Sequence, residues 1–149
     1  MPPMIRFTRE AVLNAALQLV RRDGPSALNA RAVARELGGS TQPIFRLFSG
    51  MDELHLEVIR AADAYLRQCM NSRISDSRNP YITVCMTYLL FARDEPQLFK
   101  LLFMRDRVSD GSCGQEYTHD WGFPIIEASV GVDRETAIKL YERSFFYAH

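Results

Sequence analysis

The chain has 149 residues, enough for one domain or for a small module joined to a larger helical one, and nearly half of them are apolar. This is the composition of an ordinary globular protein, and no apolar run approaches the roughly 18 residues that a membrane-spanning helix needs. The N-terminus, MPPMIRFTRE, lacks the apolar core of a signal peptide, so we expect a cytoplasmic protein with no membrane partner.

Charge is unevenly distributed along the chain. Lysines and arginines number 18, as do aspartates and glutamates, yet residues 1–50 hold seven arginines against three acidic residues. The remainder holds eleven basic and fifteen acidic residues. A basic excess confined to one end is the electrostatic footprint of a module that binds a polyanion, although a solvated surface is the simpler alternative.

The first predicted helix begins after Thr8, whose hydroxyl can cap it, and ends at the sequence Asp23-Gly24-Pro25. Its apolar residues recur at helical spacing, and they are Val12, Ala15, Ala16, Leu19 and Val20. We expect this helix to brace the segment that follows it.

Residues 29–48, NARAVARELGGSTQPIFRLF, predict two short helices joined by a tight turn. Asn29 can cap the first helix. The pair Gly38-Gly39 ends it, because glycine enters a left-handed conformation at no steric cost. Ser40 can then cap the second helix by accepting a hydrogen bond from a backbone N–H.

The second helix of the pair has an apolar and a polar side. Ile44, Leu47 and Phe48 fall on the side that we expect to be buried. A helix-turn-helix places its second helix in the DNA major groove and reads base edges with the N-terminal residues of that helix. The candidate base-reading residues are therefore Thr41, Gln42 and Pro43, with Pro43 at the third helical position, where a missing N–H breaks no intrahelical bond.

The rest of the chain predicts further helices and no strands, so the expected fold class is all-α. We expect a helix from Met51, then a polar loop at residues 71–79, then a helix from Pro80 capped by Asn79. A short apolar helix around residues 98–103 and a loop at residues 106–120 follow. The chain should end with a helix over residues 121–130, interrupted at Pro124, and a last helix from Arg134.

Enzymatic chemistry finds little support in the sequence. Cys69 and Cys85 fall in apolar helical patterns and are expected to be buried thiols. Potential ligands lie close together in one place only, at Cys113, Glu116, His119 and Asp120, and in a loop of that composition chance is favoured over a zinc site. We therefore predict no enzyme activity, no metal and no cofactor.

The first 65 residues or so resemble the DNA-binding domain of the TetR family of bacterial transcriptional regulators. The resemblance rests on the order and spacing of a series of motifs: AVLNAALQLV, the glycine Gly24, the capped segment NARAVAREL, the turn GGS, the segment PIFRLF and the start of a fourth helix, MDEL. The second half of the chain has no specific motif, so its interpretation depends on the first half.

The resemblance implies an N-terminal three-helix domain with a helix-turn-helix at residues 1–50 and a helical effector-binding and dimerisation domain at residues 51–149. It implies a homodimer that binds a pseudo-palindromic operator in double-stranded DNA, usually as a repressor, and that releases the operator when a small-molecule effector binds the second domain.

Site roles follow from the same resemblance. It implies that Asn29 and Ser40 cap helices whose N-termini point at DNA phosphates. It implies that the bases are read by Thr41, Gln42 and Pro43, and that Arg46 binds a phosphate. For each of them the alternative is a solvated surface residue or a plain cap, and Arg46 could instead pair with a nearby acid.

Three departures from the family pattern bear on this interpretation. Phe45 stands where the family usually has a tyrosine that bonds a phosphate, so an apolar contact with a sugar or methyl group would have to replace that bond. Met51 stands where a lysine usually opens the fourth helix, which predicts weaker and less salt-dependent binding. The apolar C-terminal pattern SFFYAH suggests a regulatory domain that is incomplete at its C-terminus, so that the chain is truncated or its dimer is built differently.

A ligand pocket is a weaker expectation. An apolar effector pocket could be lined by Met86, Tyr88, Phe99, Phe103, Met104 and Trp121, although aromatic residues at helical spacing are more often simply core. The rival to a DNA-binding regulator is a helical protein-interaction module that has lost DNA binding, and Phe45 and Met51 are the changes expected of it. Arginines that are paired internally would favour this rival.

Overall fold

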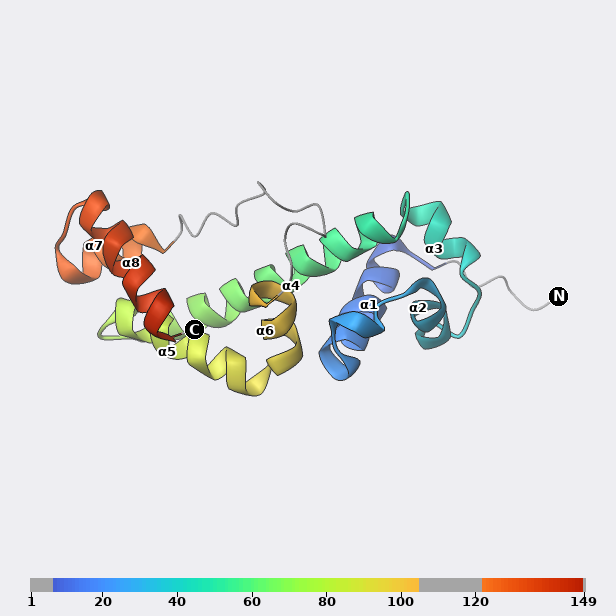
Figure 1. Cartoon of the computed structure of the whole chain (residues 1–149), viewed down its shortest axis with the longest axis horizontal. Helices are drawn as coiled ribbons and strands as arrows, with labels where there is room; N and C mark the ends of the chain where they lie inside the picture. Colours follow the sequence, from blue (N-terminus) through green and yellow to red (C-terminus); the bar gives the residue numbers. More distant parts are fainter. Residues whose placement is uncertain (1–6, 105–121, 149) are drawn as a thin grey trace. The chain divides into compact units, whose positions relative to one another are not determined.

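In the computed structural model, residues 7–104 and 122–148 are described, and within these ranges the chain forms eight α-helices, one short 3-10 helix and no strand (Figure 1). The all-α prediction is confirmed. The elements are α1 (Arg9–Asp23), η1 (Pro25–Ala27), α2 (Ala30–Glu36), α3 (Gln42–Leu47), α4 (Met51–Ile74), α5 (Pro80–Asp94), α6 (Pro96–Phe103), α7 (Phe123–Val130) and α8 (Arg134–Ala148). None of the helices in the described ranges is long and apolar enough to cross a bilayer.

The described residues form two compact units. The first comprises residues 7–65 and 95–104, and the second comprises residues 66–94 and 122–148. The division between these compact units falls inside α4, and α6 belongs with the N-terminal helices. The reason is burial, since α6 packs on α1 and its three leucines Leu98, Leu101 and Leu102 are each at most 4% exposed. The limits of the DNA-binding segment itself stay a prediction.

Side-chain caps fix the first helices of the first unit, as predicted. The Thr8 hydroxyl accepts a hydrogen bond from the Ala11 N–H at 3.1 Å and begins α1. Asn29 Oδ1 accepts from the Ala32 N–H at 2.9 Å and begins α2. Apolar residues of α1 and α2 then pack against each other, among them Val12, Ala16, Val20 and Val33, none of which is exposed. Figure 1 shows α2 and α3 beside α1.

The turn after α2 is closed by backbone hydrogen bonds. Gly38 has φ of 66° and its N–H donates to the Arg35 carbonyl at 3.1 Å, while the Gly39 N–H donates to the Ala34 carbonyl at 2.9 Å. This is the Schellman arrangement, which needs a left-handed residue at the position of Gly38. At Gly39 the constraint is steric, because a Cβ there would lie 2.7 Å from Cε2 of Phe7 and would have to displace that side chain.

The predicted cap of the next helix is wrong. The N-cap of α3 is Thr41, not Ser40, and it makes no side-chain capping bond. Its carbonyl accepts the N–H of Ile44 at 3.1 Å and opens the helix. Pro43 has no N–H to donate, which leaves Ser40 only the N–H of Gln42 as a donor for a cap. Pro43 consequently lies at the second helical position and not at the third.

A partly buried ion pair ties α6 to α1 within the first unit. Glu95, which immediately precedes α6, is 9% exposed and accepts two hydrogen bonds from Arg21, with 2.7 Å between Arg21 Nε and Glu95 Oε2. The Arg21 guanidinium also lies 5.4 Å from the centroid of the Tyr65 ring, and the Tyr65 hydroxyl lies 3.4 Å from Glu95. The carboxylate is therefore satisfied although it is almost removed from water.

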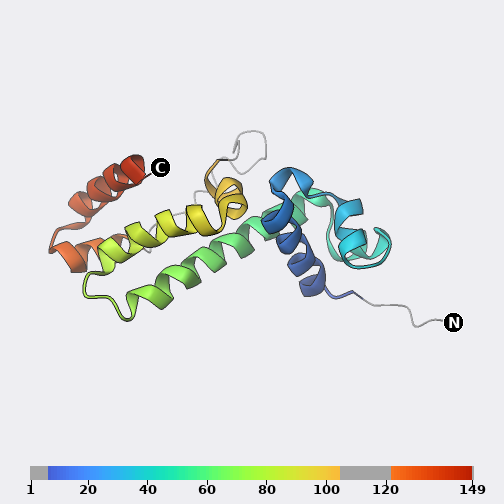
Figure 2. The same ribbon diagram turned by 90° about the horizontal axis from the view of Figure 1, so that it is seen from below.

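The second unit is held by contacts of α7 and α8 with α5, which Figure 2 shows side by side. Tyr88 of α5 lies 5.5 Å from Phe145 of α8, and Phe123 of α7 lies 5.5 Å from Tyr141, measured between ring centroids. Asn79 caps α5 as predicted, since its Oδ1 accepts from the Ile82 N–H at 3.2 Å.

Two boundaries in this unit differ from the sequence prediction. Helix α4 continues to Ile74 into the polar segment, where Ser72 donates to the Cys69 carbonyl at 3.0 Å and remains on the helix surface. Pro124 does not interrupt α7, because it lies in the first turn of that helix, where its missing N–H has no intrahelical partner to lose. The loop predicted at residues 106–120 lies outside the described residues.

Alanine substitution at two uncrowded glycines isolates the cost of a left-handed backbone conformation. A Cβ at Gly38 or at Gly50 would meet no atom within 4 Å, but only Gly38 has a positive φ. We expect Gly38→Ala to lower the free energy of unfolding by about 1 kcal/mol, whereas Gly50→Ala leaves it unchanged or slightly higher. Urea unfolding followed by circular dichroism measures both, and equal losses in the two variants would contradict the role of the left-handed turn.

Two adjacent arginines offer a second matched test. Arg21→Met strands the buried Glu95 carboxylate, so we expect a loss of about 2 kcal/mol in the free energy of unfolding. Arg22→Met removes an arginine whose side chain is 57% exposed and whose partners Asp23 and Glu36 remain in water. We expect a clearly smaller loss for that variant, because solvent screens an exposed ion pair. Thermal unfolding of the two proteins side by side gives the comparison, and a larger loss in Arg22→Met would refute it.

Candidate nucleic-acid interface

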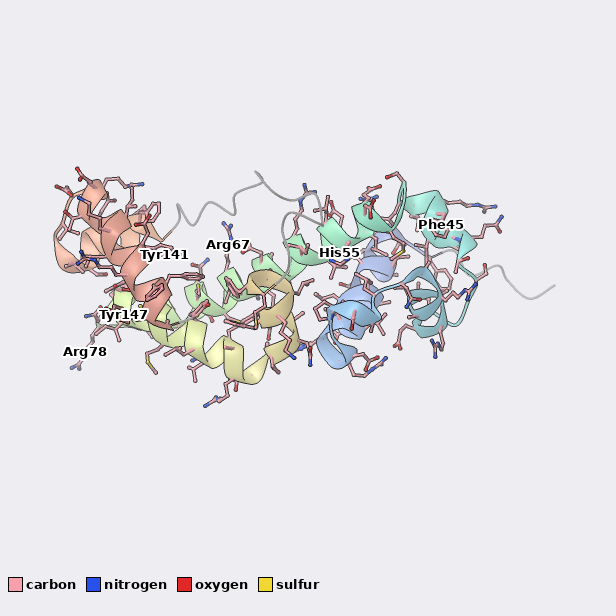
Figure 3. The ribbon with its side chains drawn as sticks, viewed as in Figure 1. Phe45, His55, Arg67, Arg78, Tyr141 and Tyr147 are labelled. Carbon is pink, nitrogen blue, oxygen red and sulfur yellow. The ribbon has the colours of Figure 1, made fainter. Side chains whose placement is uncertain are left out.

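Helix α3 has one buried side and one exposed side. Ile44 is 1% exposed and Phe48, which directly follows the helix, is 2% exposed. Gln42, Phe45 and Arg46 are exposed, and their spacing of three and four residues places them on one face. Phe45, labelled on α3 in Figure 3, is 51% exposed although its side chain is a large hydrocarbon. This face is available to a partner molecule.

The other residues predicted to bind DNA differ in their exposure to solvent. Ser40 is exposed, whereas Thr41 and Pro43 are half-buried. Asn29 is exposed, but both ends of its amide are engaged, because Oδ1 caps α2 and Nδ2 donates to the Ala27 carbonyl at 3.1 Å. Asn29 is thus a cap in this structure, and any contribution to DNA binding would come from the helix that it begins.

Arginines of the first unit divide into two sets. Those of α1 are paired with acids: Arg9 with Glu53, Arg21 with Glu95, and Arg22 with Asp23 and Glu36. Those of the two helix-turn-helix helices have no acidic partner within 4 Å among the described residues, and they are Arg31, Arg35 and Arg46. Among the described residues, Arg46 thus has no acid with which to form the alternative pair considered from the sequence.

Arg31 and Arg35 are residues that the sequence-based site prediction missed. Both are exposed and lie four residues apart on α2, so they share one side of that helix. The available signal was their spacing, but sequence alone could not say which of the seven N-terminal arginines would be neutralised by acids.

A cluster around Arg9 holds α3 against its neighbours. Arg9 of α1 donates to the Leu47 carbonyl at 2.6 Å and to Glu53 Oε1 at 2.5 Å, and its guanidinium lies 4.2 Å from the centroid of the Phe48 ring. The second oxygen of Glu53 accepts from the Ser49 N–H at 2.6 Å. Arg9 from α1 thus bonds the last residue of α3, and Glu53 from α4 bonds the turn that follows it.

The Glu53 carboxyl is strongly acidic as a result. The hydrogen bond from the Ser49 backbone lowers its pKa most, the hydrogen bond from Arg9 adds to this, and together they bring the pKa to about 2. Glu53 is therefore ionised at any physiological pH, and the bridge to Arg9 stays a pair of opposite charges.

Comparison with known proteins agrees with this geometry. Residues 12–58, which span the helix-turn-helix and the start of α4, match the model of the family described as bacterial regulatory proteins, tetR family. The chain is also 37% identical over 109 residues to an uncharacterized HTH-type transcriptional regulator from Haemophilus influenzae. The N-terminal part of the chain is thus similar to the DNA-binding segment of tetR-family regulators. The aligned region covers 70% of this chain and 52% of that relative, so the chain spans about half the length of the curated relative that it matches.

The residues of the predicted effector pocket are distributed over both units. In the second unit, Met86 is 49% exposed and Tyr88 is buried against Phe145. In the first unit, the rings of Phe99 and Phe103 are tilted at 45° to each other with their centroids 4.8 Å apart, and Met104 is 64% exposed. Trp121 lies outside the described residues. A common pocket for the six residues stays a prediction.

Potential metal ligands do not gather in the part of the chain that the structure describes, where no three histidines, cysteines or acids lie close enough to hold an ion. Cys113, Glu116, His119 and Asp120 fall outside that part. Cys69 and Cys85 are free thiols, but they are half-buried where the sequence predicted burial, and burial raises the pKa of Cys85.

The low pKa of Glu53 predicts a pH dependence of stability. Because the pKa is about 2 in the folded chain and near 4.5 when unperturbed, ionised Glu53 stabilises the fold above pH 4.5, and this contribution is lost as the pH falls toward 2. Wild type and Glu53→Gln are to be unfolded in urea between pH 2 and 7. We expect wild type to be more stable near neutrality and the difference to vanish near pH 2. A difference independent of pH would contradict this assignment.

Proposed function

We propose that this protein is a DNA-binding transcriptional regulator that uses α2 and α3 to bind a pseudo-palindromic operator as a homodimer. One observation carries the proposal: the arginines of α1 are paired with acids, whereas those of α2 and α3 are not paired among the described residues. Unpaired guanidinium groups beside an exposed helix face suit a phosphate backbone, which supplies much of the affinity of DNA-binding proteins.

Each residue of the exposed surface has a proposed role. Gln42 makes a bidentate contact with adenine, and Thr41 and Pro43 pack on thymine methyl groups. Arg31, Arg35 and Arg46 neutralise phosphates. Phe45 provides an apolar contact with a sugar or a methyl group, because it has no hydroxyl with which to bond a phosphate.

The regulatory role extends beyond this surface. We propose that the protein acts as a repressor, that an apolar small molecule bound by the second half of the chain releases it from DNA, and that it works in the cytoplasm without enzymatic activity. The match of one relative named as a transcriptional regulator supports the general role, but this chain spans about half of that relative.

DNA binding by substituted proteins tests the roles of Gln42 and Arg46. Duplexes from around the protein's own coding region are titrated across a salt series by fluorescence anisotropy. We expect Gln42→Ala to relax selectivity by about 1–3 kcal/mol at its base pair. Arg46→Ala should weaken all duplexes alike and reduce the slope of log K against log salt by about 1. Arg93→Ala, which removes a 70% exposed arginine from α5, serves as the control and should bind like wild type.

Absence of selective binding would favour the rival. If wild type binds no duplex selectively, even when the chain is extended to the length of the relative, the helix-turn-helix is better explained as a protein-interaction module. The exposed Phe45 would then belong to a protein contact.

A further inference from the structure

Helix α3 is too short to hold its own conformation. It spans six residues, begins without a side-chain cap and contains a proline. Isolated helices shorter than about 12 residues are marginal in water, so α3 depends on its surroundings both to exist and to take a fixed direction. Burial of Ile44 and Phe48 sets which side of α3 faces the core, but apolar contacts are non-directional and leave the carbonyl groups at the end of the helix without partners.

Arg9 supplies the missing directional contacts. The carbonyl of Leu47, at the last position of α3, has no intrahelical donor, and the Arg9 guanidinium donates to it at 2.6 Å. The same guanidinium lies over the Phe48 ring and bonds Glu53 of α4. Glu53 in turn accepts the N–H of Ser49, in the turn between α3 and α4. These bonds connect the end of α3 to two longer helices of the same unit.

We propose that Arg9 is a positioning residue, which together with Glu53 fixes the orientation of α3 and so sets how its exposed face meets DNA. This inference rests on the proposed function and deepens it. Arg9 is not assigned a phosphate, because Glu53 at 2.5 Å, with Glu57 at 4.0 Å, already balances its charge. The planar guanidinium group of Arg9 can donate to a carbonyl and to a carboxylate at the same time, and the ammonium group of a lysine is less suited to this.

The substitution Glu53→Gln separates positioning from simple electrostatics. Removing a negative charge near a DNA-binding surface should strengthen binding if only net charge mattered. The positioning role predicts the opposite, because an amide offers one acceptor where Glu53 uses two. We expect Glu53→Gln and Arg9→Gln to weaken selective binding by about tenfold each, and Arg9→Lys to weaken it by less.

Arg9→Gln also distinguishes positioning from direct phosphate contact. If Arg9 only positions α3, the slope of log K against log salt stays at the wild-type value while selectivity falls. If Arg9 bound a phosphate, the slope would fall by about 1 and selectivity would be kept. Arg93→Gln, with the same change in charge on α5, is the matched control for both readouts.

Amide hydrogen exchange of residues 42–48, followed by mass spectrometry, tests the positioning role without DNA. We expect exchange in α3 to rise severalfold in Arg9→Gln and Glu53→Gln while exchange in α1 and α5 stays at the wild-type level. This local pattern also excludes general unfolding. Arg9→Lys, the milder change, provides the comparison if Arg9→Gln fails to fold.

Tighter binding by Glu53→Gln, or unchanged α3 exchange in every variant, would overturn the proposal. If wild type binds no duplex selectively, the proposed function fails, and the exchange experiment still decides whether Arg9 and Glu53 hold α3.

Discussion

The first unit depends on holding a six-residue helix from outside. Helix α3 carries the exposed face formed by Gln42, Phe45 and Arg46, yet nothing within so short a helix determines its direction. Its apolar side is buried through Ile44 and Phe48, and its end is bonded by Arg9. The longer helices α1 and α4 thus hold α3 in place through hydrogen bonds at its end.

The arginines of the first unit also differ in their surroundings from helix to helix. Each arginine on α1 pairs with an acid, whereas those on α2 and α3 have no acid within 4 Å among the residues that the structure describes, although Arg35 is near enough to lower the pKa of Asp23 and Glu36. A count of charges along the sequence cannot make this distinction. Part of the arginine excess that first pointed to a polyanion is in fact structural, and the proposal of DNA binding rests on the other part.

Local features of this fold were predictable from sequence, and long-range ones were not. The caps at Thr8, Asn29 and Asn79 and the left-handed Gly38 follow from residue types at helix ends, and the structure confirms them. The predicted cap at Ser40 was wrong, since α3 begins after Thr41 without a side-chain capping bond. Pro43 removes one of the two N–H groups that a serine cap could have used. The bridge from Arg9 to Glu53 spans 44 residues, and no spacing rule links two positions so far apart.

The site was predictable to a similar extent. The order of motifs identified the family and the exposed side of α3, but it missed Arg31 and Arg35, because their pairing depends on which acids lie nearby in the folded chain. The proposed effector residues have only an apolar pattern behind them, and such a pattern is shared by any helical core.

The exposed ring of Phe45 separates two physical components of binding in the proposed complex. Contacts of the arginines with phosphates act by releasing counterions, so they respond to salt and little to temperature. Burial of the Phe45 ring removes apolar surface from water and therefore lowers the heat capacity on binding. A regulator built in this way would have an affinity for DNA with a curved temperature dependence, because a hydrocarbon ring without a hydroxyl lies on its exposed face.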